Sequence, residues 1–175
     1  DIKADTSGDL CKVYLQVLAP SRGTRKGDAA ADAEALYKAG QGKVGTDEAA
    51  IINILATASA AHLSDVFYAY GSKYGKSLDV VIRDEMAGDV GKALSNLATP
   101  PHILFAKKLL HSMEGAGTKD DKLIRILVTQ RGRHLKEAGK HFLEVNKKNV
   151  STWVADETSG DYKALLLKIC AAEGI

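Results

Sequence analysis

The sequence predicts an all-α protein that is built from repeats. A glycine-containing loop, Gly-Lys-Val-Gly-Thr-Asp-Glu at 42–48, returns as Gly-Ala-Gly-Thr-Lys-Asp-Asp at 115–121, and the second glycines of the two loops lie 72 residues apart. Glu85 and Glu157 each follow that second glycine by 40 residues. Such a period is typical of repeat architectures. No segment alternates apolar and polar residues beside turn dipeptides, so no sheet is expected.

The first residues are expected to complete one unit and to lead into the next. Residues 1–20 carry apolar side chains at helical spacing between Leu10 and Leu18, and Pro20 stops that helix. The following residues, 21–28, are polar, basic and glycine-bearing, which is typical of an exposed linker. A helix over 29–39, rich in alanine, then delivers the chain into the first loop.

Four more helices are expected after the first loop. Thr46 is expected to cap the next helix, since its hydroxyl can accept a hydrogen bond from an unpaired backbone N–H. A long amphipathic helix follows with apolar residues over 63–74. A short helix over 77–86 brings Glu85 to its last turn, and a fifth helix ends before Pro100.

The second unit repeats this order of helices. The expected spans are 102–113, 118–128, a helix around 135–145, 151–157, and a last helix with apolar residues over 162–170. Gly132 and Gly139 lie in or beside the third of these helices. There each is expected to cost up to about 1 kcal/mol relative to alanine.

Composition excludes several classes of function. Lys and Arg exceed Asp and Glu by only 2, so no overall field selects nucleic acid, and no apolar run is long enough to span a membrane. Cys11 and Cys170 are expected to be buried reduced thiols. The five histidines are scattered without metal spacing or a nucleophile pattern, so we expect no enzymatic activity.

The loops and their distal carboxylates together favour a hard cation. Glycines let a loop turn its carbonyl oxygens outward, and one carboxylate can complete a cage of oxygens. Calcium is the natural occupant, because magnesium prefers a near-octahedral, water-rich shell and zinc prefers His or Cys. A single Gly-x-Gly-Thr is weak evidence, but two copies with matched carboxylates indicate a metal site.

At this point the sequence resembles the annexins. The resemblance is carried by Leu-Tyr-Lys-Ala-Gly at 36–40, Gly-Thr-Asp-Glu at 45–48, Leu-Ile-Arg-Ile at 123–126 and Asp-Glu-Thr-Ser-Gly-Asp-Tyr at 156–162, with Ala-Leu-Leu-Leu at 164–167. It implies repeats of five helices, each wound into a right-handed superhelix, of which the family has four. The chain is similar to the C-terminal half: the end of repeat two, then repeats three and four.

The resemblance also implies a division of the chain. Residues 1–20 would end an incomplete annexin-like repeat and 21–28 would be a linker. Residues 29–99 and 100–175 would then be one annexin-like repeat each.

A calcium cage in each unit is implied by the same resemblance. In the first unit the implied ligands are the carbonyls of Gly40, Lys43 and Gly45 with the carboxylate of Glu85. In the second unit they are the carbonyls of Met113, Gly115 and Gly117 with the carboxylate of Glu157. Gly42 competes with Gly40, because the first loop is one residue longer between its glycines. Lys119 replaces an acid of the family pattern, which argues against auxiliary ion sites but leaves the main cage intact.

The implied function is calcium-dependent binding to anionic phospholipid membranes. Calcium held by five protein oxygens keeps positions for a lipid phosphate. Lys43, Val44 and Ala116 at the loop tips are expected to contact the membrane. We therefore expect a cytoplasmic protein that becomes peripheral on membranes when calcium rises, and that self-associates or binds a missing N-terminal half.

Two other classes of function remain open from the sequence. A calcium-independent helical-repeat scaffold or protein-interaction module would use the loops only as folding elements. An enzyme that hydrolyses nucleotides or acts like a peroxidase would need a convergent acid-base or nucleophile group, and the sequence indicates none.

Overall fold

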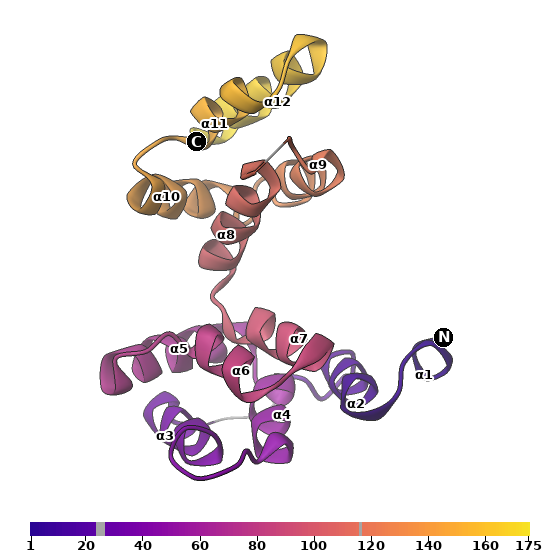
Figure 1. The fold of residues 1–175 in the computed structure, drawn as a ribbon, viewed down its shortest axis with the longest axis vertical. Coiled ribbons are helices and arrows are strands. Elements are labelled where there is room, and N and C mark those ends of the chain that lie inside the picture. Colours follow the sequence, from indigo (N-terminus) through magenta and orange to yellow (C-terminus); the bar gives the residue numbers. More distant parts are fainter. Residues whose placement is uncertain (24–26, 116) are drawn as a thin grey trace. The chain divides into compact units, whose positions relative to one another are not determined.

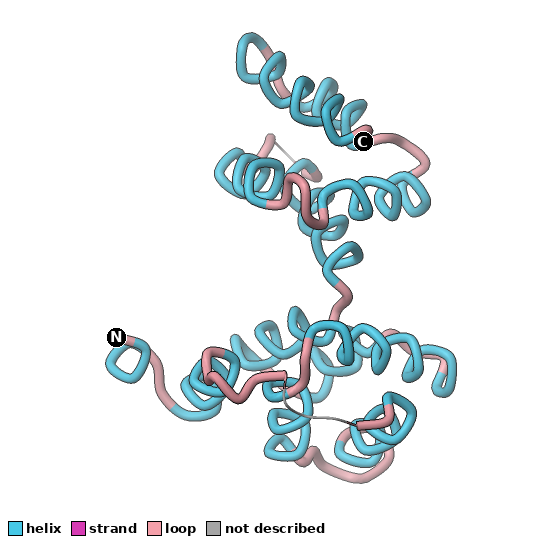
Figure 2. The backbone as a smooth tube through the Cα atoms, turned by 180° about the vertical axis from the view of Figure 1, so that it is seen from behind, coloured by secondary structure: helices cyan, strands magenta, loops and turns pink. Residues whose placement is uncertain are grey.

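The helical prediction is confirmed by the structure. The computed structural model describes residues 1–23, 27–115 and 117–175, and the regular elements in these residues are helices (Figures 1 and 2). The chain divides into two compact units, Asp1–Pro100 and Pro101–Ile175. No helix in the described part of the chain is both long enough and apolar enough to cross a bilayer.

Seven helices belong to the first unit. They are α1 (Ile2–Asp5), α2 (Gly8–Val17), α3 (Ala29–Ala39), α4 (Glu48–Thr57), α5 (Ala60–Tyr74), α6 (Leu78–Glu85) and α7 (Gly88–Ala98). Five helices form the second unit: α8 (Pro101–Met113), α9 (Asp120–Thr129), α10 (Leu135–Asn146), α11 (Val150–Glu157) and α12 (Gly160–Glu173). The expected five-helix order is therefore present twice, as α3 to α7 and as α8 to α12.

Helix ends follow local chemistry closely. The helix expected over 29–39 has the same bounds in the structure, and α5 ends at Gly75, whose φ of 68° is the left-handed conformation that glycine adopts without strain. As expected, α6 carries Glu85 in its last turn. The predicted linker contains residues 24–26, which lie outside the described residues.

Each unit buries an apolar core between its long helices. In the first unit α3 packs on α5 and α6 packs on α7, and in the second α8 packs on α10. The largest wholly buried side chains are Ile51, Leu55, Leu63, Tyr70, Leu78, Ile82 and Leu94 in the first unit, and Leu109, Met113, Leu123, Leu127 and Phe142 in the second. The core face predicted for α4 is thus confirmed, since Ile51, Ile52, Ile54 and Leu55 are all buried.

The N-terminal helices are covered less completely than the helical spacing suggests. Val13 of α2 is buried, whereas Tyr14 and Leu18 are exposed. Both cysteines are free thiols, but only Cys170 is buried, and Cys11 is half-buried. The prediction of two buried thiols is therefore wrong for Cys11, because the helix that carries it packs one narrow face on its own unit.

The expectation that Gly132 and Gly139 weaken a helix is wrong for both residues. Gly132 lies before α10 with a φ of 62°, and its N–H donates to Glu173 at 3.2 Å, so a turn there requires glycine. Gly139 lies within α10, but a Cβ at that position would come within 2.2 Å of the Ile175 side chain. Tertiary contacts thus outweigh helix propensity at both sites.

A histidine pair between α8 and α10 predicts how the second unit responds to pH. The rings of His102 and His141 meet edge to face with centroids 5.9 Å apart. Burial, and next the charge of His141, lower the pKa of His102 below its usual value, although Glu137 and Glu144 act in the opposite direction and His134 adds to the lowering. Because the unfolded chain then binds more protons, stability is retained above the ordinary histidine pKa and is lost as pH falls.

We therefore expect thermal unfolding of the chain to shift to lower temperature between about pH 7.5 and about pH 5.5. His102→Gln should show a smaller shift, because glutamine does not titrate. His111→Gln, which changes an exposed histidine on the same helix, serves as the control. An identical pH dependence in wild type and His102→Gln would contradict the assignment.

Candidate functional site

The first loop connects α3 to α4 and is held by backbone hydrogen bonds. The N–H of Gly42 donates to the carbonyl of Tyr37 at 2.8 Å, and the N–H of Asp47 donates to that of Ala39 at 2.7 Å. A Cβ on Gly42 would lie 2.9 Å from the Tyr37 carbonyl oxygen, and Gly45 has a φ of 80°. Both positions therefore require glycine, and the loop is a closed turn at the end of α3.

Glu85 comes back to this loop from the last turn of α6. Its Oε2 accepts a hydrogen bond from the hydroxyl of Thr46 at 2.6 Å. A Cβ on Gly40 would lie 3.1 Å from Glu85 Cγ and 3.4 Å from Oε2. The structure therefore brings together Gly40, Thr46 and Glu85, which are far apart in the sequence.

Thr46 does not cap α4 as expected. The cap is Asp47, whose carboxylate accepts from the N–H of Ala50 at 3.0 Å. The physical reason is that Asp47 is one residue closer to the helix and serves the same purpose. The Thr46 hydroxyl is then available to Glu85, where it orients the carboxylate.

The groups around the first loop fit a hard cation. The carbonyl of Gly40 accepts one hydrogen bond, from the N–H of Lys43 at 3.1 Å, and retains a second lone pair. In the described residues no loop or turn N–H donates to the carbonyls of Lys43 or Gly45. With Glu85 alongside, the available donors are all oxygen, which suits calcium better than a metal that prefers nitrogen or sulfur.

A cluster of ligating side chains is not what the structure offers. Within the described ranges, no group of three or more His, Cys, Asp or Glu side chains is placed to hold a metal ion. The predicted cages are of a different kind, since each uses backbone oxygens and a single carboxylate.

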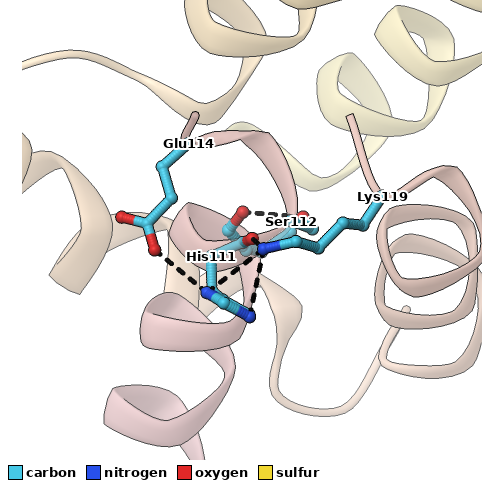
Figure 3. Close-up of polar contacts among 5 residues, drawn as sticks. His111, Ser112, Glu114 and Lys119 are labelled. Atoms are coloured by element: carbon cyan, nitrogen blue, oxygen red, sulfur yellow. Dashed lines mark hydrogen bonds and ion pairs between the residues drawn. The ribbon is translucent and has the colours of Figure 1, made fainter. Parts of the chain in front are cut away.

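The second loop connects α8 to α9 and is fastened differently. Gly115 and Gly117 have φ values of 97° and 85°, so both need glycine, while Ala116 lies outside the described residues. The Lys119 ammonium donates to the carbonyl of His111 at 2.8 Å and lies 3.1 Å from Nε2 of its ring (Figure 3).

Two further contacts complete the attachment of this loop. The backbone N–H of Lys119 donates to the carbonyl of Ser112 at 2.8 Å, and the His111 ring contacts Glu114 at 3.0 Å (Figure 3). The lysine that replaces an acid of the expected pattern therefore ties the loop to the C-terminal turn of α8. A cation there also suits the negative end of the helix dipole.

The second distal carboxylate is less tightly held than the first. Glu157 ends α11 as expected and is half-buried. The hydroxyl of Thr118, which corresponds to Thr46, donates to Asp120 at 2.6 Å. Within the part of the chain that the structure describes, no hydrogen bond or ion pair reaches the Glu157 carboxylate. The two loops thus share a backbone pattern but differ in how their carboxylates are oriented.

Comparison with known proteins was made for the sequence and for the fold. The family model described as Annexin matches residues 31–97 and 104–169, one match in each helical unit. The chain belongs to the annexin family. Both matches include the glycine loop and the carboxylate 40 residues beyond it.

Individual annexins match nearly the whole chain. Human annexin A13 is 39% identical over 178 residues, covering 97% of this chain and 56% of its own length. Human annexin A8 is 37% identical over 181 residues, covering 99% of this chain and 55% of its own length. The chain therefore spans about half the length of these relatives.

Solved annexin structures share the fold. Annexin III superposes with a TM-score of 0.79 at 31% identity, covering 97% of this chain and 55% of that one. A calcium-bound annexin, (Sm)1, gives a TM-score of 0.71 at 27% identity and covers 96% and 52% of the two chains. The sequence-based recognition of an annexin half, with its all-α repeats, is confirmed.

Sequence reasoning missed the groups around Glu85 that do not belong to the loop. Tyr37, Gln41 and Tyr74 lie beside it, together with three lysines. These residues come from separate elements, so no local motif announces them. Only the absence of the same side chains at corresponding positions of the second unit could have drawn attention to them.

Proposed function

We propose that this annexin chain binds anionic phospholipid membranes in a calcium-dependent manner through one loop in each unit. The observation that carries the proposal is the meeting of Glu85 with Gly40 and Thr46 at the first loop. The annexin family and the calcium-bound relative of similar fold support it.

The chain's own groups would hold calcium by oxygen alone. In the first unit the proposed ligands are the carbonyls of Gly40, Lys43 and Gly45 and the carboxylate of Glu85. In the second they are the carbonyls of Met113, Gly115 and Gly117 and the carboxylate of Glu157. When bound, calcium would use its remaining coordination positions for a lipid phosphate, since it accepts roughly six to eight oxygens.

The remaining work falls to residues of the chain. Thr46 holds one oxygen of Glu85 by a hydrogen bond and thereby limits the rotation of the carboxylate. The left-handed conformations of Gly45, Gly115 and Gly117 set the direction of the loop backbone. One carboxylate per loop is a small negative charge, so the affinity of each loop for calcium should rise when an anionic lipid supplies further oxygens.

The tip of the first loop is shaped for contact with a membrane. Val44 is completely exposed, with a relative accessibility of 103%, and Lys43 beside it is exposed too. An apolar side chain held fully in water on a glycine-rich turn gains free energy by entering the interfacial region. Lys43 adds attraction to anionic headgroups. Ala116, the expected contact of the second loop, is proposed for the same role on sequence grounds alone.

Replacing Val44 by Ser is expected to weaken vesicle binding about tenfold at saturating calcium, because the valine side chain no longer leaves water on binding. The calcium concentration for half-maximal binding should change less. The measurement is cosedimentation with phosphatidylserine vesicles. Val80→Ser, which changes a half-exposed valine of α6, is the control, and an equal loss in both variants would contradict insertion of Val44.

The direct test of the function uses the unaltered chain. We expect cosedimentation with phosphatidylserine vesicles in calcium, release by chelator, and little binding to neutral vesicles. Equal binding with and without calcium, or none at all, would favour the alternative of a helical scaffold or interaction module. In a cell the proposal corresponds to a cytoplasmic protein that becomes peripheral on membranes as calcium rises.

A further inference from the structure

An open cavity of about 660 Å³ lies beside the first loop, within the range of roughly 300–1,000 Å³ that is usual for ligand pockets. Glu85 forms part of its wall, so the cavity adjoins the proposed calcium site. Its cationic residues are Lys43 from the loop, Lys73 from the last turn of α5, and Lys76 from the connection between α5 and α6. Three lysines from three segments therefore converge beside a single carboxylate.

Aromatic residues give the cavity a rigid wall. The rings of Tyr37 and Tyr74 stack with centroids 4.1 Å apart and planes 3° from parallel, and both residues line the cavity. Behind them Tyr70 is wholly buried and donates a hydrogen bond to the side-chain oxygen of Gln41 at 3.2 Å. This leaves the amide nitrogen of Gln41, a donor, as the other polar end of a side chain that also lines the cavity.

Burial keeps Tyr70 in its donor form. Desolvation is the main cause that raises its pKa to about 12, with smaller contributions from Tyr74, Tyr37 and Glu85. The contact between Tyr70 and Gln41 therefore persists across the physiological pH range. The wall of the cavity thus has a fixed shape and offers hydroxyl and amide groups to a polar ligand.

The charge balance of the cavity favours a polyanion. Lys73 pairs with Glu34 at 3.0 Å, and Glu34 also pairs with Lys38 at 2.6 Å. These two lysines lower the pKa of Glu34 to about 2, so this carboxylate is ionised and is shared between two cations. The three lysines of the cavity thus outnumber its one lining carboxylate, and calcium at Glu85 would add to the positive charge.

A phosphatidylserine headgroup suits such a cavity poorly. Its own ammonium group would face the lysines and be repelled. A phosphomonoester carries about −1.5 to −2 charges at neutral pH and no ammonium, and lysine binds phosphate as a compact point charge. The polyol ring of an inositol headgroup would add hydroxyls for Gln41 and the tyrosines. The chemistry therefore selects a phosphorylated ring.

We propose that this cavity binds a polyol ring that bears two or more phosphomonoesters, supplied by an inositol bisphosphate lipid in the membrane to which the first loop attaches. The lysines would contact the phosphates, while Gln41, Tyr37 and Tyr74 would contact the ring. As a lipid site it rests on the proposed function, because the loop must bring the membrane to the cavity. It makes the first unit selective for one class of anionic lipid.

The second unit provides an internal comparison. Seventy-two residues after Tyr37, Lys73 and Tyr74, the second unit has Leu109, Val145 and Asn146. Leu109 is buried in the core of that unit, and Val145 is an exposed apolar residue. The lysine pair and the stacked rings are therefore confined to the first unit, and selectivity for a phosphorylated ring should follow that unit alone.

The test compares two kinds of vesicle of equal surface charge at saturating calcium, one with phosphatidylserine and one with phosphatidylinositol bisphosphate. The unaltered chain should bind the bisphosphate vesicles more tightly. Lys73→Gln combined with Lys76→Gln should weaken binding to bisphosphate vesicles by about tenfold and should leave binding to phosphatidylserine vesicles nearly unchanged. Circular dichroism checks that the helices are retained.

A charge-matched control separates the cavity from net charge. Lys12→Gln combined with Lys140→Gln removes two exposed lysines that, like Lys73, pair with a carboxylate but do not line the cavity. This control should bind both vesicles like the unaltered chain. The cavity proposal is overturned if the chain shows no preference between the vesicles, or if cavity and control variants lose affinity equally.

Soluble inositol trisphosphate distinguishes the source of the ring and separates the two proposals. Calorimetric titration of the chain with this probe should give binding that the cavity variant loses, in a single site and with lower affinity than the bisphosphate membrane. Equal affinity for the soluble and membrane ligands would assign the cavity to a free polyol phosphate. If the chain ignores all vesicles yet binds the soluble probe, the proposed membrane function fails and the cavity stands; binding to phosphatidylserine vesicles without binding of the probe is the reverse result.

Discussion

Replacing both Glu85 and Glu157 by Gln is expected to abolish calcium-dependent binding to phosphatidylserine vesicles, and each single change should raise the calcium requirement at least about tenfold. Each carboxylate is the only full negative charge in its proposed set of ligands. Glutamine keeps the shape of the side chain and one oxygen but loses that charge. The measurement is cosedimentation over a calcium titration, with the two single variants and the double variant run side by side.

The two single changes should differ in size. Glu85 is oriented by Thr46, whereas Thr118 of the second loop donates to Asp120 instead. A carboxylate that is already oriented loses less conformational freedom when it binds an ion, so the first unit should hold calcium more tightly. Glu85→Gln is therefore expected to have the larger effect at low calcium.

Matched controls lie one residue away from each carboxylate. Asp84 and Asp156 directly precede Glu85 and Glu157 and are exposed. Asp84→Asn and Asp156→Asn remove the same charge without touching the proposed ligands, and should bind vesicles like the unaltered chain. Calcium-dependent binding that survives in the double glutamine variant would contradict the assignment of these carboxylates.

Gly91→Ala is expected to lower the free energy of unfolding by about 3 kcal/mol or more, which corresponds to a fall of roughly 6–12 °C in Tm. Gly91 is buried in α7, where a Cβ would lie 1.8 Å from the carbonyl oxygen of Met86 and 2.8 Å from its carbonyl carbon. Met86 caps α6, so this clash involves backbone at a helix junction and cannot be relieved by a side-chain rotation. Thermal unfolding followed by circular dichroism measures the effect.

The same substitution at Gly71 provides the comparison. Gly71 lies inside α5, and the nearest atom to a Cβ there is the Lys76 carbonyl oxygen at 3.9 Å, an ordinary contact. Alanine should therefore stabilise the chain by about 0.5–1 kcal/mol through helix propensity. Equal effects of the two substitutions would show that the approach of α6 and α7 is not as close as described.

Much of the fold follows from the sequence because helices are specified by neighbouring residues. Apolar spacing, alanine content and a glycine at the C-terminus predict α3 and α5, and the recurrence of one loop with one distant carboxylate predicts two similar units. Periodicity of this kind needs no knowledge of what a helix packs against. The boundaries of the repeats within the chain remain a prediction on the same grounds.

Only the tertiary structure decided which groups meet. Asp47 rather than Thr46 caps α4, and this leaves Thr46 to orient Glu85 across a gap of 39 residues. Lys119 fastens the second loop through contacts with the end of α8, and Gly91 is required by the backbone of another helix.

The cavity beside the first loop is decided in the same way, since it gathers residues from α3, the loop, α5 and α6. The sequence by itself determined the helices, the repeat and the identity of the two carboxylates, because these are local or periodic features. Their partners depend on the distances between elements that are remote along the chain. Such distances are set by the packing of the core, which no single stretch of sequence encodes.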